Sequence, residues 1–238
     1  EGMATLKSAK DAHSLVSTLR EHFDAGVTVK RDWRVDQLEA LRRMIVDNEA
    51  VLEAALYKDL GKSATEAQLT EIGVLLGDID YALKHLSDWL KPQRVSVPLA
   101  LVPARAFTVA EPLGIALIMA PWNYPLMLLL SPLIGALAAG NAVVLKPSEV
   151  SSETSKAIAA LIPAYLDPRG VAVVEGGVKE TTWLLDQHWD HIFYTGNGHV
   201  GRIVMAAAAK NLTPVSLELG GKSPLYIDDT VDLEAAAE

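Results

Sequence analysis

The sequence predicts an α/β protein in which a parallel sheet is covered by helices on both faces. Three observations support this fold class. Residues 1–90 carry apolar side chains at helical spacing, residues 91–113 are rich in proline, and short apolar segments alternate with helical segments from Gly114 onward. Such alternation is typical of parallel strands that are buried on both faces. We therefore expect an N-terminal helical layer, a projecting β-hairpin and then the sheet.

The N-terminal layer rests on two apolar stripes at helical spacing, separated by Gly61 and Ser63. The stripes consist of Val35, Leu38, Leu41, Ile45, Leu52 and Leu56, followed by Ile72, Leu75, Leu76, Ile79, Leu83 and Leu86. Because heptads are not sustained, a packed helical layer is favoured over a coiled coil.

The segment 91–113 is predicted to be an extended hairpin. Four prolines exclude a regular helix, and the residues between them favour extended chain; the prolines are 92, 98, 103 and 112, and the extended residues are Val95, Val97, Leu99, Leu101 and Val102. An unpaired strand edge invites pairing with another chain, so this hairpin is a candidate for oligomerisation, as in a homodimer. A surface loop packed on its own domain is an equally open alternative.

Residues 114–218 are expected to form a dinucleotide-binding α/β domain. The predicted strands are Ile115–Ala120, Ala142–Leu145, Val171–Val174, His191–Tyr194 and Val215–Leu219. The predicted helices between them are Leu126–Ala139, Ser152–Tyr165, Thr181–Gln187 and His199–Lys210. Polar clusters lie at the carboxyl ends of four of these strands, where ligands bind on parallel sheets. The clusters lie at 121–123, 146–149, 196–201 and 218–222.

Residues 196–201 match the pattern G-x-G-x-x-G between a predicted strand and a predicted helix. Backbone N–H groups at such a turn can meet a pyrophosphate, which predicts a Rossmann-like dinucleotide site. The pattern expects a ribose-binding acid about 20 residues later, and Glu218 lies there. The pattern usually follows the first strand of such a unit, whereas here three other predicted strands precede the strand that leads into the turn. A plain turn is the alternative.

Two further clusters have both a functional and a structural interpretation. Lys146 and Glu149 could hold the adenosine ribose, or they could lie at a solvated helix start that Ser148 or Ser151 caps. The Asn123 amide could donate to an oxyanion, or Asn123 could form an Asx-turn before Pro125.

Glu218 precedes a pair of glycines at the end of an apolar strand. Partly apolar surroundings raise the pKa of a carboxylate toward neutrality, which would let Glu218 deprotonate a water molecule as a general base. A structural pair with Lys222 is equally open.

The composition narrows the class of protein. Among 238 residues half are apolar, the net charge is −9, and no basic and aromatic cluster is present, so we expect no nucleic-acid partner. The absence of cysteine excludes disulfides and thiolate metal ligands, and the six histidines are scattered, so we expect no metal site. No signal peptide or membrane segment is indicated, and a cytoplasmic location is expected. Asp232 begins a helix that lacks a stop signal, which suggests that the chain is a fragment.

Five segments resemble the aldehyde dehydrogenase superfamily, especially its class 3 and fatty-aldehyde-oxidising branch. They are Glu111–Gly114, Pro121–Pro125, Ala139–Glu149, Thr195-Gly196 with Gly201, and Leu217–Pro224. The resemblance implies NAD(P)-dependent oxidation of an aldehyde to a carboxylic acid through a cysteine thioester. It implies that Asn123 is the oxyanion donor and Glu218 the general base. It further implies cofactor binding by Trp122, Lys146, Glu149, Gly196, Asn197, Gly198, Val200 and Gly201.

The chain departs from the family pattern in two places. Asn197-Gly198-His199 replaces a more usual segment with hydroxyl side chains, so we expect altered cofactor affinity. The family cysteine follows the Glu-Leu-Gly-Gly-Lys segment, beyond residue 238, so residues 219–238 would begin a catalytic domain whose remainder is absent. The chain alone is then expected to be inactive. NAD or NADP is the expected cofactor, with NAD only slightly favoured, because Glu149 repels a 2′-phosphate while Lys146 could attract one.

Three alternatives stay open. A non-catalytic dinucleotide-binding or assembly module would explain the missing cysteine. An ordinary Rossmann alcohol dehydrogenase would use Glu218 for ribose and needs no thiol. An acylating or phosphate-releasing reductase of the same superfamily is a nearer rival, but it needs no hydrolytic base, so Glu218 counts against it.

Overall fold

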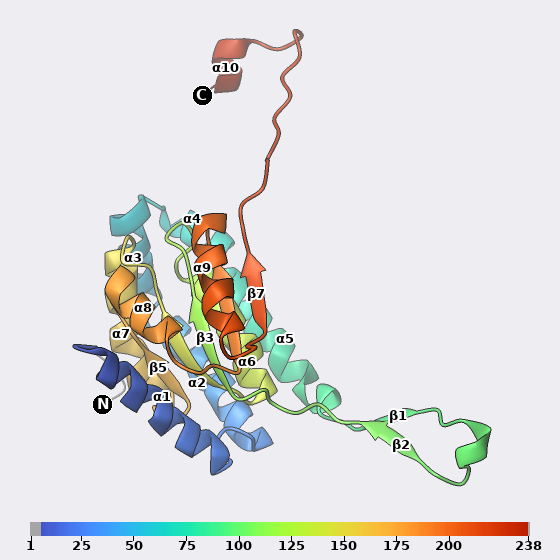
Figure 1. The fold of residues 1–238 in the computed structure, drawn as a ribbon. Coiled ribbons are helices and arrows are strands. Elements are labelled where there is room, and N and C mark those ends of the chain that lie inside the picture. Colours follow the sequence, from blue (N-terminus) through green and yellow to red (C-terminus); the bar gives the residue numbers. More distant parts are fainter. Residues whose placement is uncertain (1–5, 238) are drawn as a thin grey trace.

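The computed structural model describes residues 6–237, and its centre is a parallel sheet of five strands (Figure 1). The sheet order is β5-β4-β3-β6-β7. The strands are β3 (Ile115–Met119), β4 (Ala142–Lys146), β5 (Val171–Val173), β6 (His191–Thr195) and β7 (Val215–Glu218). Each predicted strand is confirmed to within one residue at either end, and the α/β class is confirmed.

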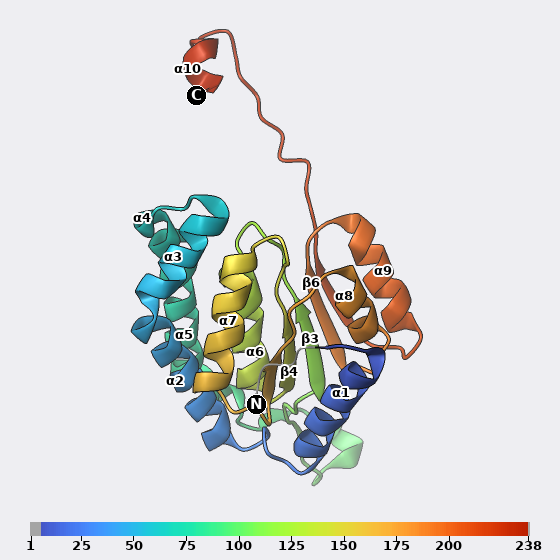
Figure 2. The same cartoon turned by 90° about the vertical axis from the view of Figure 1, so that its left-hand side faces the viewer.

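Helices cover both faces of this sheet (Figure 2). The helices on one face are α2 (Arg31–Asp47), α3 (Glu49–Leu60), α5 (Gly73–Trp89), α6 (Met127–Ala139) and α7 (Ser152–Tyr165). Those on the other face are α1 (Ala9–Asp24), α8 (Val178–Leu185) and α9 (Gly198–Ala209). Successive strand residues point to opposite faces. Ile118 and Leu145 accordingly enter the first core, while Leu117 and Val144 enter the second.

The chain order of the strands creates a switch point in the sheet. The chain runs from β3 through β4 to β5 on one side, and then returns to place β6 and β7 on the other side of β3. This is the Rossmann order 3-2-1-4-5, in which ligands bind beyond the carboxyl ends of the two strands at the reversal. In this chain those strands are β3 and β6.

The predicted N-terminal helical layer is present. Its remaining elements are α4 (Ala64–Ala67) and the π-helix η1 (Gln68–Ile72), which lead directly into α5. Gly61 ends α3 in the left-handed conformation, at φ 69°, which glycine adopts without a Cβ penalty. The sharp turn that follows carries Lys62 into the interior, where its side chain is only 8% exposed.

The hairpin projects from the body (Figure 1), with β1 (Gln93–Val95) antiparallel to β2 (Ala106–Thr108). The prediction of extended chain was wrong at its tip, where Leu99–Leu101 forms a 3₁₀ turn, η2. Pro98 presets the backbone for a turn, and its carbonyl accepts a 2.9 Å hydrogen bond from the Leu101 N–H. Leu99 at this tip is 88% exposed.

Two further boundaries can be compared with the sequence. Helix α8 begins at Val178, three residues before its predicted start, because Glu180 turns back to accept a hydrogen bond from the Gly177 N–H at 2.9 Å. Helix α10 (Leu233–Ala237) follows Asp232 as expected, since that carboxylate accepts from the Glu234 N–H at 2.9 Å. Within residues 6–237, no helix combines the length and apolarity needed to cross a bilayer.

Candidate functional site

All four predicted polar clusters lie at the carboxyl ends of strands of the one parallel sheet. The strands are β3, β4, β6 and β7, which pair in parallel register, and Lys146 and Glu218 are the last residues of β4 and β7. The carboxyl ends of these strands therefore share one edge, the edge at which β7 leaves the sheet (Figure 1). The turn that contains Asn123 and the turn that begins at Gly196 flank the switch point between β3 and β6.

Asn123 presents its side chain to solvent at this edge. Among residues 6–237 its amide group has no hydrogen-bond partner, so the alternative of an Asx-turn is wrong. The residue two positions later is Pro125, whose nitrogen carries no hydrogen to donate. The NH₂ group is therefore available to an external acceptor. Trp122, predicted to contact a cofactor, is half-exposed on the same turn.

Two residues that the sequence reasoning missed hold the Asn123 turn. Lys62 Nζ donates a 3.0 Å hydrogen bond to the backbone carbonyl of Asn123 and lies 2.6 Å from Glu71 Oε1. Glu71 is fully buried. One signal for Glu71 existed: it lies four residues before Leu75 and eight before Ile79, in line with a buried apolar stripe.

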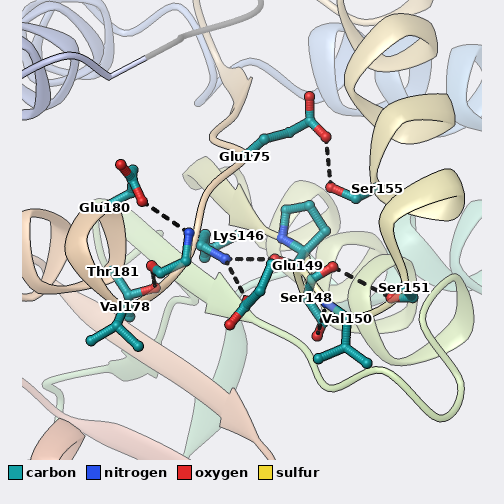
Figure 3. A network of polar contacts seen from close by, with 12 residues as sticks. Lys146, Ser148, Glu149, Val150, Ser151, Ser155, Glu175, Val178, Glu180 and Thr181 are labelled. Atoms are coloured by element: carbon teal, nitrogen blue, oxygen red, sulfur yellow. Dashed lines mark hydrogen bonds and ion pairs between the residues drawn. The ribbon is translucent and has the colours of Figure 1, made fainter.

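Lys146, the last residue of β4, lies beside Glu149 (Figure 3). Lys146 Nζ donates to the Pro147 carbonyl at 2.7 Å and is 3.6 Å from Glu149 Oε2. Burial lowers the pKa of Lys146, and the charge of Glu149 partly opposes that shift. Glu149 itself is half-exposed. The Glu149 carboxylate can therefore contact a ligand, while the buried Lys146 ammonium holds the carboxylate in place.

The start of α7, just after this pair, is capped differently from either serine alternative. Ser148 Oγ accepts from the Val150 N–H at 3.2 Å, and Ser151 makes no side-chain cap. Asp59 of α3 instead accepts from the backbone N–H groups of Glu153, at 3.0 Å, and Thr154, at 2.7 Å. The two serine alternatives for helix capping are therefore wrong, and Asp59 performs this role.

The glycine turn connects β6 to α9 as predicted. Asn197 caps the helix, since its side-chain oxygen accepts from the Val200 N–H at 2.9 Å. The first helical bond runs from the Gly201 N–H to the Asn197 carbonyl at 3.0 Å. The N–H groups of Gly198 and His199 precede that bond, so they stay available to an anion at the positive end of the helix dipole.

The close packing at this turn explains two of its glycines. A Cβ at Gly196 would collide with the hydroxyl of Tyr194, which donates to the Asn197 carbonyl at 3.3 Å. A Cβ at Gly201 would lie 3.0 Å from Leu219 Cδ2. Gly198 has room for a side chain, with Arg202 Nη1 the nearest atom at 3.5 Å. Val200 packs into the second core and orients the helix.

Glu218 is the last residue of β7, directly opposite Thr195 of β6. Its carbonyl accepts a 2.9 Å hydrogen bond from the Gly196 N–H. Its side chain is exposed, so the expectation of partly apolar surroundings was wrong in this structure. The residues that follow β7 run away from the body (Figure 1). Within the described chain no ion pair joins it to Lys222, which removes the structural alternative.

These residues suit a dinucleotide. Gly196 packs closely against Tyr194 of β6, and the N–H groups of Gly198 and His199, which have no hydrogen-bond partner among residues 6–237, suit the pyrophosphate. Glu149 lies after β4, the second strand of the Rossmann order, where an acid ordinarily holds the ribose hydroxyls. The strand order and this edge define an α/β protein with a Rossmann-type fold.

The chain belongs to the aldehyde dehydrogenase family, whose sequence model matches residues 2–238. It is 50% identical over 224 residues to aldehyde dehydrogenase family 3 member H1 of Arabidopsis thaliana, an alignment that covers 94% of this chain and 46% of that protein. The resemblance to the class 3 branch is thereby confirmed.

Solved structures agree with this assignment. The substrate-bound state of Staphylococcus aureus AldH has a TM-score of 0.89 and 41% identity, over 94% of this chain and 49% of that one. A Mycobacterium tuberculosis aldehyde dehydrogenase complexed with NAD⁺ has a TM-score of 0.81 and 28% identity, over 98% and 48%. The chain thus spans about half the length of the relatives it matches.

Proposed function

We propose that the full-length protein carrying this chain oxidises an aldehyde to a carboxylic acid with a nicotinamide dinucleotide and a cysteine nucleophile. The observation that supports this most is the shared sheet edge, where Asn123 after β3 and Glu218 at the end of β7 lie on either side of the glycine turn after β6. Because these 238 residues contain no cysteine, the thiol comes from outside this segment.

In this proposal Asn123 stabilises the negative charge that develops on the aldehyde oxygen. When a thiolate adds to the carbonyl carbon, the electron pair of the C=O bond moves onto the oxygen. The Asn123 amide is exposed and has no partner within residues 6–237, so it can donate to that oxygen without breaking an existing bond. A donor of this kind contributes roughly 10²–10³ in rate.

Glu218 acts as the general base for hydrolysis of the thioester. It accepts a proton from water as the water oxygen attacks the thioester carbon, and the thiolate then leaves. The carboxylate is exposed and free of an ion pair with Lys222, which suits a group that must reach water. The hydrogen bond from the Gly196 N–H to the Glu218 carbonyl fixes the position of the Glu218 backbone, and thus of the base of its side chain.

The dinucleotide is held by the edge on both sides of the switch point. Glu149 accepts from the ribose hydroxyls and Lys146 supports it, while Gly198 and His199 offer N–H groups to the pyrophosphate and Trp122 lines the adjoining turn. When bound, the nicotinamide accepts a hydride from the substrate. The relative from Mycobacterium tuberculosis was solved with NAD⁺, and the exposed charge of Glu149 disfavours a 2′-phosphate, so NAD is the preferred cofactor in this proposal.

The hairpin provides the surface for a homodimer in this proposal. Its apolar side chains Leu99, Phe107 and Val109 are more than half exposed, and its short strands leave unpaired edges.

The test is turnover of a medium- or long-chain aldehyde by the full-length protein, followed as reduced nicotinamide and as carboxylic acid. Asn123→Ala should lower kcat roughly 10²–10³-fold without weakening NAD binding. Asn211→Ala, at an exposed asparagine after α9, is the matched control and should leave kcat unchanged. Equal turnover by Asn123→Ala and wild type, or NAD binding with no aldehyde oxidation by any form, would contradict the proposal and favour a non-catalytic module.

A further inference from the structure

A buried ion pair lies beneath the Asn123 turn, in the N-terminal helical layer. Lys62 Nζ and Glu71 Oε1 are 2.6 Å apart, and the two side chains are 8% and 0% exposed. Removing two charges from water costs several kcal/mol per ion, and apolar residues of similar volume often stabilise a fold equally well. A contribution to the stability of the helical layer is therefore not enough to explain why a buried ion pair occupies these positions.

The other hydrogen bonds of Lys62 and Glu71 all go to the backbone of one short segment, residues 123–127. Lys62 Nζ donates to the Asn123 carbonyl at 3.0 Å and lies 3.8 Å from the centroid of the Tyr124 ring. Glu71 Oε2 accepts from the N–H groups of Leu126, at 2.9 Å, and Met127, at 3.0 Å. The pair thus binds both ends of the turn that connects β3 to α6.

The local backbone places Glu71 for this contact. Glu71 lies in the π-helical turn η1, a geometry that is rare and frequently found at functional sites. Gly73 permits the turn, because a Cβ there would lie 2.7 Å from the Gln68 carbonyl oxygen. The helical layer accepts an irregular turn at the position where its buried carboxylate reaches the start of α6.

We propose that Lys62 and Glu71 are positioning residues that set the Asn123 side chain for its role as oxyanion donor. With the Asn123 carbonyl bound inward by Lys62 and the following N–H groups bound by Glu71, the peptide planes on both sides of the turn are fixed. The amide of Asn123 is left pointing away from the protein at the carboxyl end of β3. This inference rests on the proposed function, because it concerns the donor of that reaction.

The magnitude follows from the geometry that such a donor needs. Donors act at about 2.7–3.1 Å from the oxyanion, and a displacement of about 1 Å can cost roughly 10²-fold in rate. Replacing Lys62 by methionine removes the bond to the Asn123 carbonyl while keeping a similar side-chain length. We expect kcat to fall about 10²-fold in the full-length enzyme, with the Kd for NAD unchanged.

The decisive test is a double-mutant cycle with Asn123→Ala. If Lys62 acts through Asn123, Lys62→Met should lower kcat by less than about 3-fold in the Asn123→Ala background, because no donor is left to misplace. A merely structural role would give the same fold-decrease in both backgrounds, and that result would overturn the inference. Lys58→Met is the matched control, since this exposed lysine of α3 pairs only loosely with Glu153, at 3.6 Å.

A second variant keeps the test decisive if Lys62→Met does not fold. Glu71→Gln retains an oxygen for the Leu126 and Met127 N–H groups but removes the charge that holds Lys62. It should lower kcat about 10-fold, and again this loss should disappear in the Asn123→Ala background. Equal losses in both backgrounds would contradict the inference. If Asn123→Ala alone leaves kcat unchanged, the proposed function itself fails, which distinguishes the two failures.

Discussion

The backbone N–H of Gly196 donates a 2.9 Å hydrogen bond to the carbonyl oxygen of Glu218. This bond joins the first residue of the glycine turn to the last residue of β7. The turn proposed to hold the pyrophosphate is therefore bonded directly to the strand end proposed to activate water, beside the paired strands β6 and β7. A ligand seated on the turn lies next to the strand end that carries the carboxylate.

Gly196→Ala should destabilise the glycine turn. The new methyl group would displace the Tyr194 hydroxyl, and overpacking of this kind costs about 1–3 kcal/mol. Chemical denaturation measures the free energy of unfolding. Gly198→Ala is the control and should change it little, because that position has room. The penalty of Gly196→Ala should shrink in a Tyr194→Leu background; an undiminished penalty there would assign the strain to another contact.

Glu149→Gln should weaken NAD binding about 10–100-fold, because a hydrogen bond to a charged group contributes roughly 1.5–3 kcal/mol. NADP binding should weaken less, since the variant also removes repulsion of the 2′-phosphate. Isothermal titration calorimetry with both dinucleotides checks this, with Glu21→Gln of the exposed face of α1 as the control. Unchanged NAD affinity would contradict this role of Glu149 and would favour ribose binding by Glu218, as in an ordinary alcohol dehydrogenase.

Asp59→Ala should lower the free energy of unfolding by about 1–2 kcal/mol, because it removes the cap of α7. Asp24→Ala, at the exposed end of α1, should have little effect. Equal effects of the two substitutions in urea unfolding would show that the α7 cap contributes nothing beyond a general change of charge.

His191 should make stability depend on pH. Burial lowers its pKa in the folded state, and its Nδ1 atom is buried without a hydrogen-bond partner in the described chain. As the pH falls below the ordinary histidine value of about 6.5, the unfolded chain binds a proton that the folded chain resists, so stability falls until the folded-state pKa is reached. His191→Gln should flatten this part of the curve. The exposed His13→Gln should not, and a wild-type slope in His191→Gln would refute the assignment.

The sheet could be predicted from the sequence because its signals are local. Each strand is a short apolar run, and β3 and β4 are buried along their whole length, as parallel strands covered on both faces must be. The prediction from local signals was wrong at the tip of the hairpin. There Pro98 begins a turn, and this turn outweighs the preference of Leu99–Leu101 for extended chain.

The positions of three candidate residues were predictable because each lies at or a few residues beyond the carboxyl end of a strand. Asn123, Glu149 and Glu218 lie where strand ends place them. Lys62, Glu71 and Asp59 were missed because their partners are distant along the chain: Lys62 is 61 residues from Asn123, and Asp59 is 94 residues from Glu153. Periodicity within one helix contains no information about such contacts. The exposure of Glu218 depends on the path of the chain after β7, which local patterns also do not specify.

The central claim is that Glu218 serves hydrolysis and not cofactor binding, and pre-steady-state kinetics of Glu218→Gln in the full-length protein test it most directly. We predict a rapid burst of reduced nicotinamide, followed by steady-state turnover lowered roughly 10²–10⁴-fold, with the Kd for NAD unchanged. Near-normal steady-state turnover, or a loss of NAD affinity that accounts for the whole decrease, would contradict the claim.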